Sequence, residues 1–170
     1  SFESFLPIQA AQLLRQRPPE RMSPMWTPQK GMVGWAKENA VSSGLKDAPI
    51  RWLVDDCEKF VEREIRRGNT YDAIIMDPPS YGRGPKGEIW KIEDMIHPLI
   101  KLCTKILSKD AIFFLVNSYT TGLAPAVLTY MISTELKPWN GHVESQEIGL
   151  PVTDSGLVLP CGASGRWESD

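Results

Sequence analysis

The fold is decided by one short stretch, IIMDPPSYG at residues 74–82. An apolar, β-branched run after Asp72 is typical of a buried parallel strand, and this run ends abruptly on an acid, two prolines, a hydroxyl and an aromatic ring. In open α/β sheets, ligands bind outside the carboxyl ends of the strands. We therefore expect residues 77–81 to form part of the floor of a binding crevice.

The loop after this strand is expected to be stiff. Pro78 and Pro79 fix their own backbone angle and cannot donate a backbone hydrogen bond, which leaves carbonyl groups to accept from a substrate. Tyr81 can offer a flat face to a nucleobase. Ordinary turns favour the same residue types, so D-P-P alone leaves a plain turn open as the alternative.

Apolar periodicity predicts alternating strands and helices around this stretch. We expect helices at 32–43, 58–67, 92–107 and 123–133, and strands at 50–54, 74–77, 111–117, 142–150 and 157–159. The last two strands are predicted to form an antiparallel hairpin. This order is that of an α/β, doubly wound sheet with helices on both faces.

The longer string DPPSYGRGPKGEIW at residues 77–90 resembles the substrate-side motif of class I S-adenosylmethionine (SAM)-dependent methyltransferases. Within that class it resembles the ribosomal RNA large-subunit methyltransferase-like branch, and the likeness extends from about residue 31 to 167. The resemblance implies a Rossmann-like sheet with an antiparallel C-terminal hairpin. It also implies S-adenosyl-L-methionine as cofactor and an RNA base, in an rRNA-like substrate, as methyl acceptor.

The resemblance implies catalytic roles for Asp77, Pro78, Pro79 and Tyr81, which would hold a flipped planar base in line with the methyl group. From their position beside the predicted crevice, we also expect substrate contacts for four further residues: Ser80, Arg83, Asn117 and Tyr119. Ser80 departs from the commonest forms of the motif, where an aromatic residue or Lys often follows Pro-Pro. The methylated atom is therefore left open.

The cofactor side is expected at Asp55, Asp56 and Cys57, together with Asp77. By resemblance, an acid after the strand at 50–54 accepts from the adenine amino group, and the next backbone amide contacts the ring. Asp56 is the first choice for the acid and Asp55 the second. Either residue could instead cap the following helix, which N-terminal Asp does well, or one could do each job.

Cysteine chemistry and metal binding are not expected. A cytosine C5 methyltransferase would need a cysteine nucleophile, and Cys161 is the only loop candidate, with an ordinary structural cysteine as the alternative. Cys103 is expected in a helix core. Cys57, Cys103 and Cys161 lack the spacing of a zinc site or a disulfide framework, so we expect no metal.

Composition gives few clues to partners. A net charge of -2 and a pI near 5.8 provide no basic footprint for a phosphate backbone, although Arg83, Lys86 and Lys91 gather after the Pro-Pro loop. Residues 82–88 suit either a lid over the substrate, anchored by Trp90, or a plain connection. We expect no membrane span and a cytoplasmic protein, and the sequence leaves the oligomeric state open.

Residues 1–30 do not fit this fold. A class I methyltransferase needs a first strand that runs into a Gly-rich loop and a second strand that ends in a ribose-binding acid. Residues 1–30 contain no glycine, and we expect no strand there and at most a short helix at 8–16. We therefore expect an atypical segment at 1–30, in place of the cofactor-loop region, and a partial methyltransferase catalytic domain at 31–170.

The genetic code offers a hypothesis for this segment. If the third base of each codon is joined to the first two bases of the next, degenerate codons from Phe5 through Lys30 permit F-A-Y-T-G-G-A-x-V-A-A-A-A-A-G-A-D-V-T-H-V-D-A-S-K-G. The codons of Met25, Trp26 and Thr27 leave no choice there and must give Val-Asp. The alternative is a genuine divergent segment that merely tolerates this shifted reading.

Two other functions remain open. The incomplete cofactor site is compatible with a catalytically inactive α/β fragment or an interaction module. A nucleotide-binding oxidoreductase is weaker, because the G-x-G-x-x-G fingerprint is absent.

Overall fold

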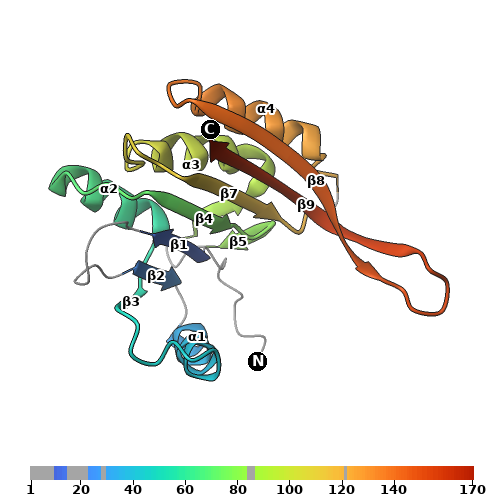
Figure 1. Cartoon of the computed structure of the whole chain (residues 1–170), viewed down its shortest axis with the longest axis horizontal. Coiled ribbons are helices and arrows are strands. Elements are labelled where there is room, and N and C mark those ends of the chain that lie inside the picture. Colours follow the sequence, from blue (N-terminus) through green and yellow to red (C-terminus); the bar gives the residue numbers. More distant parts are fainter. Residues whose placement is uncertain (1–9, 15–22, 28–29, 84–86, 121) are drawn as a thin grey trace.

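The computed structural model describes residues 10–14, 23–27, 30–83, 87–120 and 122–170. Within these residues the main feature is a seven-stranded sheet in the order β3-β2-β1-β4-β7-β9-β8, beside a two-stranded ribbon of β5 and β6. Figure 1 shows α2, α3 and α4 gathered together, with α1 away from them beside β2 and β3. The predicted α/β sheet with a C-terminal antiparallel hairpin is confirmed.

The elements run along the chain as β1 (Ala10–Leu14), β2 (Ser23–Thr27), α1 (Lys30–Ser42), β3 (Ile50–Val54), α2 (Cys57–Arg67), β4 (Ala73–Asp77), β5 (Tyr81–Arg83), β6 (Ile89–Lys91), α3 (Ile92–Thr104), β7 (Phe113–Ser118), α4 (Pro125–Glu135), β8 (Gly141–Pro151) and β9 (Val158–Ser169). From α1 onward, each predicted helix and strand is present within a few residues of its expected bounds. The exception in length is β9, which continues far beyond the predicted 157–159.

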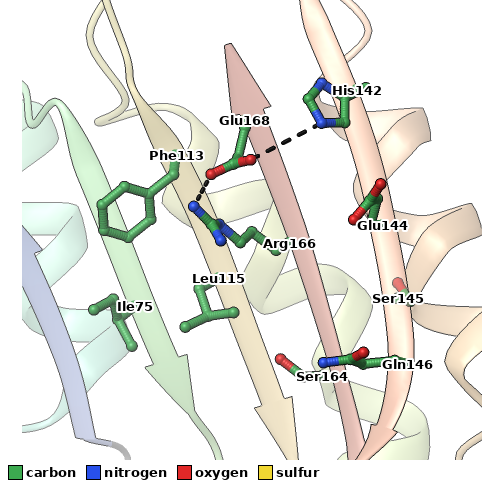
Figure 2. A pocket seen from close by; sticks show the side chains of 10 residues that line it. All are labelled: Ile75, Phe113, Leu115, His142, Glu144, Ser145, Gln146, Ser164, Arg166 and Glu168. Carbon is green, nitrogen blue, oxygen red and sulfur yellow. Dashed lines mark ion pairs between the residues drawn. The ribbon is translucent and has the colours of Figure 1, made fainter.

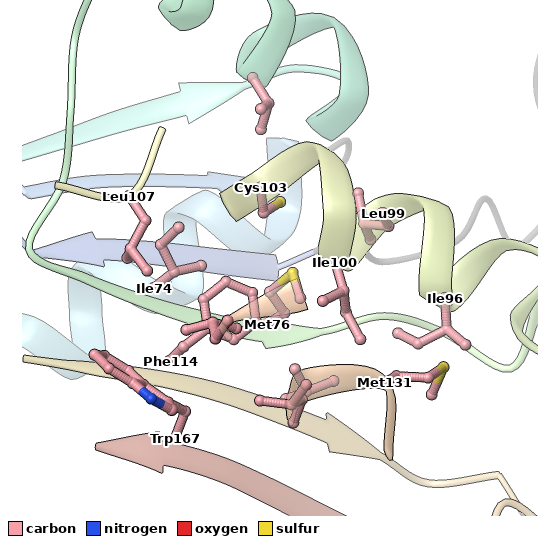
Figure 3. Packing of buried hydrophobic residues seen from close by; sticks show 14 of the residues in the cluster. Ile74, Met76, Ile96, Leu99, Ile100, Cys103, Leu107, Phe114, Met131 and Trp167 are labelled. Atoms are coloured by element: carbon pink, nitrogen blue, oxygen red, sulfur yellow. The ribbon is translucent and has the colours of Figure 1, made fainter. Parts of the chain in front are cut away.

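The core lies between the sheet and the helices α2, α3 and α4. Ile74 and Met76 of β4 pair in register with Phe114 and Val116 of β7, and all four side chains are buried (Figure 3). Burial of each such side chain contributes about 1.5–3 kcal/mol. The alternate residues of these strands point to the opposite face of the sheet, as the period of two requires.

The prediction for residues 1–30 was wrong where the structure describes them. Strands β1 and β2 are present, although we expected no strand, and β1 lies inside the range expected to be at most a helix. Proline breaks and the lack of alternation hid these strands, which form by pairing with neighbours far along the chain. Residues 1–9, 15–22 and 28–29 lie outside the described part.

The direction of β1 is unusual for this sheet. β2 runs parallel to β3, and β4 runs parallel to β7, whereas β1 is antiparallel to both of its neighbours, β2 and β4. It follows that β2, β3, β4 and β7 run in the same direction and that β1 alone among these five runs the other way. The carboxyl ends of these four parallel strands therefore lie along one edge of the sheet, across the strand direction. We call this edge the site edge.

No helix in the described ranges is long and apolar enough to cross a membrane.

Helix α2 is defined by its ends and by one buried acid. Asp56 caps its start by accepting from the Lys59 amide at 3.1 Å, and Gly68, with φ 68°, ends it in the left-handed conformation. On the buried side, Glu64 is 1% exposed. Its carboxylate accepts from the Tyr71 hydroxyl at 2.5 Å, from Asn69 at 2.8 Å and from Arg67 at 2.8 Å.

Burial alone would raise the pKa of Glu64, but the hydrogen bonds from Tyr71, Arg67 and Asn69 outweigh it and hold the pKa below its ordinary value. A lowered pKa means that the carboxylate stabilises the fold above the unfolded-state pKa of about 4.3. This contribution is lost as the pH falls through the lower folded-state value.

We expect Glu64→Gln to reduce the free energy of unfolding by about 1–3 kcal/mol at pH 7, because an amide donor then faces the donors around it. The difference from the wild type should shrink as the pH falls below about 4 towards the lowered folded-state pKa, through which the wild-type carboxylate loses its charge. Urea denaturation at pH 7 and at pH 3–4 measures both effects. Glu62→Gln, at an exposed position on the same helix, is the control and should change little; equal losses in the two variants would contradict the prediction.

Candidate active site

Parallel strands bring the predicted residues to one edge of the sheet. β3 ends at Val54, directly before Asp55, and β4 ends at Asp77. β7 ends at Ser118, directly before Tyr119. Because these strands all end at the site edge, the residues expected on the cofactor side and those expected on the substrate side lie along the same margin, with β2 and β1 between β3 and β4.

The loop after β4 is held in place by three hydrogen bonds from residues later in the chain. The Trp90 indole N–H donates to the Pro79 carbonyl at 2.7 Å, and the Ile92 amide donates to the Ser80 carbonyl at 3.1 Å. The Thr120 hydroxyl donates to the Ser80 hydroxyl at 2.6 Å. We call Trp90, Ile92 and Thr120 the loop clamp.

The loop clamp corrects one expectation. The carbonyls of the loop were expected to be free for a substrate, but those of Pro79 and Ser80 already accept from the protein. This leaves the Pro78 carbonyl and the Asp77 carboxylate as the candidate acceptors of the loop. Asp77 is half-buried, and this burial raises the pKa of its carboxyl group.

The segment after the loop is more ordered than a plain connection. β5 and β6 form an antiparallel ribbon in which Tyr81 pairs with Lys91 and Gly82 with Trp90. Trp90 is 7% exposed, which confirms that it anchors the far end of this segment in the core. Sequence periodicity missed both strands, because each is only three residues long. Residues 84–86, and with them the predicted lid tip and Lys86, lie outside the described part.

Two tyrosines at the site edge present exposed rings. Tyr81 is 51% exposed and Tyr119 is 55% exposed. The Arg83 guanidinium donates to the Tyr81 hydroxyl at 3.0 Å, which holds an exposed cation beside this ring. Asn117 is partly buried, and its amide oxygen accepts from the Ser164 hydroxyl on β9 at 2.8 Å.

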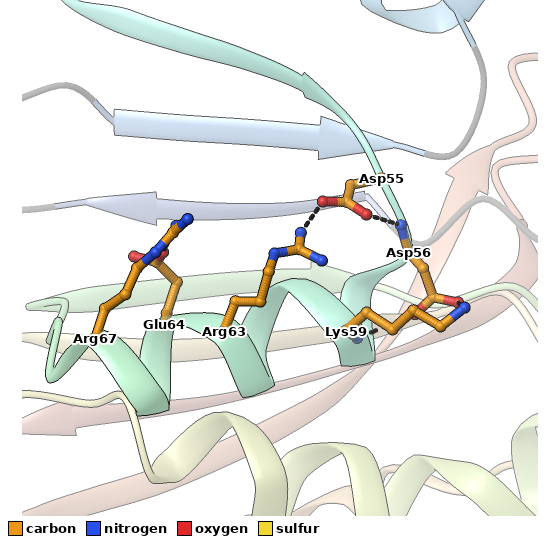
Figure 4. A network of polar contacts seen from close by, with 6 residues as sticks. All are labelled: Asp55, Asp56, Lys59, Arg63, Glu64 and Arg67. Carbon is orange, nitrogen blue, oxygen red and sulfur yellow. Dashed lines mark hydrogen bonds and ion pairs between the residues drawn. The ribbon is translucent and has the colours of Figure 1, made fainter.

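The acids on the cofactor side already have partners (Figure 4). Asp56 caps α2, so the capping role left open by the sequence is present. Asp55 accepts from the Asp56 amide at 2.9 Å and is ion-paired with Arg63 on the second turn of α2. Cys57 is buried, and its backbone begins α2.

The three cysteines belong to no group of side chains that could bind a metal in the described ranges. Cys57 and Cys103 are buried in the core, as predicted for Cys103, and the three cysteines are free thiols. Cys161 lines a hollow of about 260 Å³ together with Thr120 of the loop clamp, and its thiol donates to the Leu159 carbonyl at 3.3 Å. In the described ranges no group of three or more His, Cys, Asp or Glu residues could hold a metal ion.

A larger hollow, of about 670 Å³, lies on the sheet face that points away from the buried core (Figure 2). Its apolar floor is formed by Ile75 of β4 with Phe113 and Leu115 of β7, all partly exposed. Its wall carries the ion pair between Arg166 and Glu168. This hollow was not expected from the sequence. None of the predicted site residues lines it.

The residues at the site edge do not make a complete site for SAM. A Gly-rich turn after the first strand is needed there, but β1 is reversed, so its carboxyl end at Leu14 pairs with Ala73 at the opposite edge. Its first residue, Ala10, is the one beside Asp77. β2 ends at Thr27 with no acid, next to Val54 of β3. The described chain therefore supplies Asp55, Asp56 and Asp77, but neither the glycine turn nor the ribose acid.

The chain is similar to solved structures of methyltransferases. The chain is similar to the solved structure of a SAM-dependent methyltransferase from Agrobacterium tumefaciens, with 36% identity, a TM-score of 0.76 and coverage of 86% of this chain and 49% of that one. It shares its fold with a putative methyltransferase complexed with SAH, at 18% identity, a TM-score of 0.66 and coverage of 86% of this chain and 39% of the other. No family model matches the chain.

One curated relative is also a methyltransferase. Over 87 residues the chain is 28% identical to ribosomal RNA large subunit methyltransferase K of Neisseria meningitidis serogroup B. The aligned residues make up 51% of this chain and 25% of the relative. The chain thus spans about half the length of the Agrobacterium protein and a quarter of the Neisseria protein. These findings confirm the resemblance to class I SAM-dependent methyltransferases and the fold that it implied.

We expect Trp90→Phe to loosen the loop after β4, because the ring still fills its place in the core while the Pro79 carbonyl loses its donor. Trp139→Phe is the matched control, since its indole N–H donates to the Ser108 carbonyl at 2.8 Å, away from the loop. Both variants should lose about 0.5–1.5 kcal/mol of stability. Hydrogen exchange should rise at the Ser80 and Tyr81 amides in the Trp90 variant only; unchanged exchange at these amides would show that the loop does not depend on the clamp.

Proposed function

We propose that this chain carries the catalytic domain of a SAM-dependent methyltransferase that acts on a base of RNA, in an rRNA-like substrate. The observation that supports the proposal best is the loop from Asp77 to Tyr81, which ends a central strand at the site edge and is fixed by the loop clamp. The name of the Neisseria relative supports ribosomal RNA as the substrate class. The cofactor of the class supplies the methyl group.

The residues of the loop suit the binding of a planar base. The Asp77 carboxylate and the Pro78 carbonyl can accept from the donor edge of a base, while the exposed ring of Tyr81 can stack on its face. Transfer of a methyl group needs little covalent help from the protein and depends on holding the acceptor atom in line with the donor. Ser80, Arg83, Asn117 and Tyr119 would form the walls around the base.

The alternative is a catalytically inactive α/β fragment or interaction module. One observation favours it for the chain as printed, namely the lack of a glycine turn and a ribose acid at the site edge. The two proposals differ in what a complete cofactor site would do: it would confer methyl transfer on a methyltransferase domain and would change nothing in an interaction module.

We expect Tyr81→Ala to weaken binding of a short unstructured RNA, because a stacked base contributes about 1–3 kcal/mol, which is about 5- to 150-fold in Kd. Tyr130→Ala is the matched control, since Tyr130 is 73% exposed on α4. Fluorescence anisotropy at one fixed salt concentration measures both, because RNA affinity depends steeply on salt. Equal affinities of the two variants would remove Tyr81 from the substrate site.

The direct test of the activity is the transfer of labelled methyl groups from SAM to total RNA, by the chain equipped with a complete cofactor loop. We expect Asp77→Asn to reduce transfer at least about 100-fold, because the base loses the acceptor that positions it. The variant should remain folded, since burial disfavours the charge that it removes. Asp110→Asn, at an exposed position before β7, is the control. Full activity of the Asp77 variant would contradict its role.

A further inference from the structure

We propose that residues 5–30 are an out-of-frame translation of the segment that completes the cofactor site. This inference goes beyond the methyltransferase function, because it concerns which peptide the encoding DNA specifies. It starts from the mismatch between a substrate loop that is fully formed and a cofactor edge that lacks its glycine turn and its ribose acid.

The first support is the direction of β1. The strand is inserted between β2 and β4, in the slot that a doubly wound sheet gives to its first strand, but it runs against both neighbours. Only the eight residues 15–22 separate β1 from β2. A connection of this length suits an antiparallel pair, whereas a parallel crossover needs about a dozen residues or more, usually in a helix.

The second support is that the shifted reading supplies the missing parts in the right order. It places a strand end at positions 5–8 and Thr-Gly-Gly across positions 8–11, followed by an Ala-rich run across 11–19 that is long enough for a crossover helix. A first strand that ends near position 8 would run toward the site edge. In the printed chain Ala10 already lies at that edge, paired with Asp77. The printed β1 and the restored first strand would therefore occupy the same place in the sheet and differ only in direction.

The third support is the register of β2. The last base of the Trp26 codon is G, and the Thr27 codon begins with AC. Together they form GAC, so the shifted reading must have Asp at this point. Thr27 pairs with Val54, the residue directly before Asp55. The new acid would therefore end β2 at the site edge, one strand away from the acids on the cofactor side, which is where a ribose-binding acid is needed.

The right-handed crossover rule also assigns a place to the new helix. The steps from the first strand to β2 and from β2 to β3 go in the same direction across the sheet. Both crossovers therefore put their helices on one face, which is the face of α1. The step from β3 back to β4 reverses direction and puts α2 on the other face. The new helix would add a layer on the face that carries Ile75, which is partly exposed in the described chain.

The frame inference makes a definite claim about the DNA. For both glycines to appear, the codon of Gln9 must be CAG and the codon of Ala10 must be GCG, and no stop codon can occur in the shifted frame across positions 5–30. The shifted codons end on the second base of codon 31, and Met32 begins one base later. The DNA read for the printed chain must therefore contain one base too many near codons 29–31. Sequencing the source DNA tests these points. A CAA codon at Gln9, or any codon other than GCG at Ala10, would overturn the inference.

A synthetic gene gives the second test. We call its product the frame-restored chain; it carries the shifted reading over positions 5–31 and the printed sequence from Met32. Calorimetric titration of SAH into the printed chain and the frame-restored chain should show at least about 100-fold tighter binding to the restored one, because several polar contacts are regained together. A restored chain with both new glycines changed to alanine is the control and should fold but lose this binding.

The outcomes separate the two proposals. Matching codons and SAH binding by the restored chain support both. Matching codons with a more cooperative thermal unfolding but no SAH binding would overturn the proposed function and leave the frame inference standing. Codons that do not match, or a restored chain that unfolds more readily than the printed one, would overturn the frame inference, while RNA binding through Tyr81 would still test the function.

Discussion

The parallel pairing of β4 with β7 is the constraint on which the rest of the structure depends. Ile74 lies opposite Phe114 and Met76 opposite Val116, and all four are buried under the helices. A slip of one residue would turn this set to the other face, so the register is strongly specified. The same register brings the carboxyl ends of the two strands together, which lets Thr120, after β7, donate to Ser80, after β4.

Much of the fold could be predicted because its signals are local. The strand β3 has the predicted bounds, and α2 begins and ends where Asp56 and Gly68 indicate. The position of the candidate site at the end of β4 followed from an apolar run that ends on Asp77. The loop clamp could not be predicted, since its hydrogen bonds join residues 11 and 40 positions apart, and no local pattern encodes such contacts. The ribbon of β5 and β6 was hidden for a related reason, because three-residue strands leave no period to detect.

The N-terminal segment shows where such reasoning fails and why. β1 and β2 occupy the gap between β3 and β4, whose backbone groups would otherwise be unpaired at a cost of about 1–3 kcal/mol for each buried group. Any segment that can extend is therefore favoured in this gap, whatever its side chains. The gap fixes where a strand lies, and the length of the connection between β1 and β2 favours its direction. In the printed chain a connection of eight residues suits an antiparallel β1, whereas the shifted reading offers a strand, a glycine turn and a crossover.

We propose that one edge of the sheet holds a methyltransferase site whose substrate half is formed by the loop after β4 and whose cofactor half depends on the reading frame. The most direct measurement is a crystal structure of the frame-restored chain with SAH. The account predicts a first strand parallel to β4, a glycine turn at the site edge, and SAH seated between the end of β3 and Asp77. A first strand still antiparallel to β4, or SAH bound away from Asp77, would contradict it.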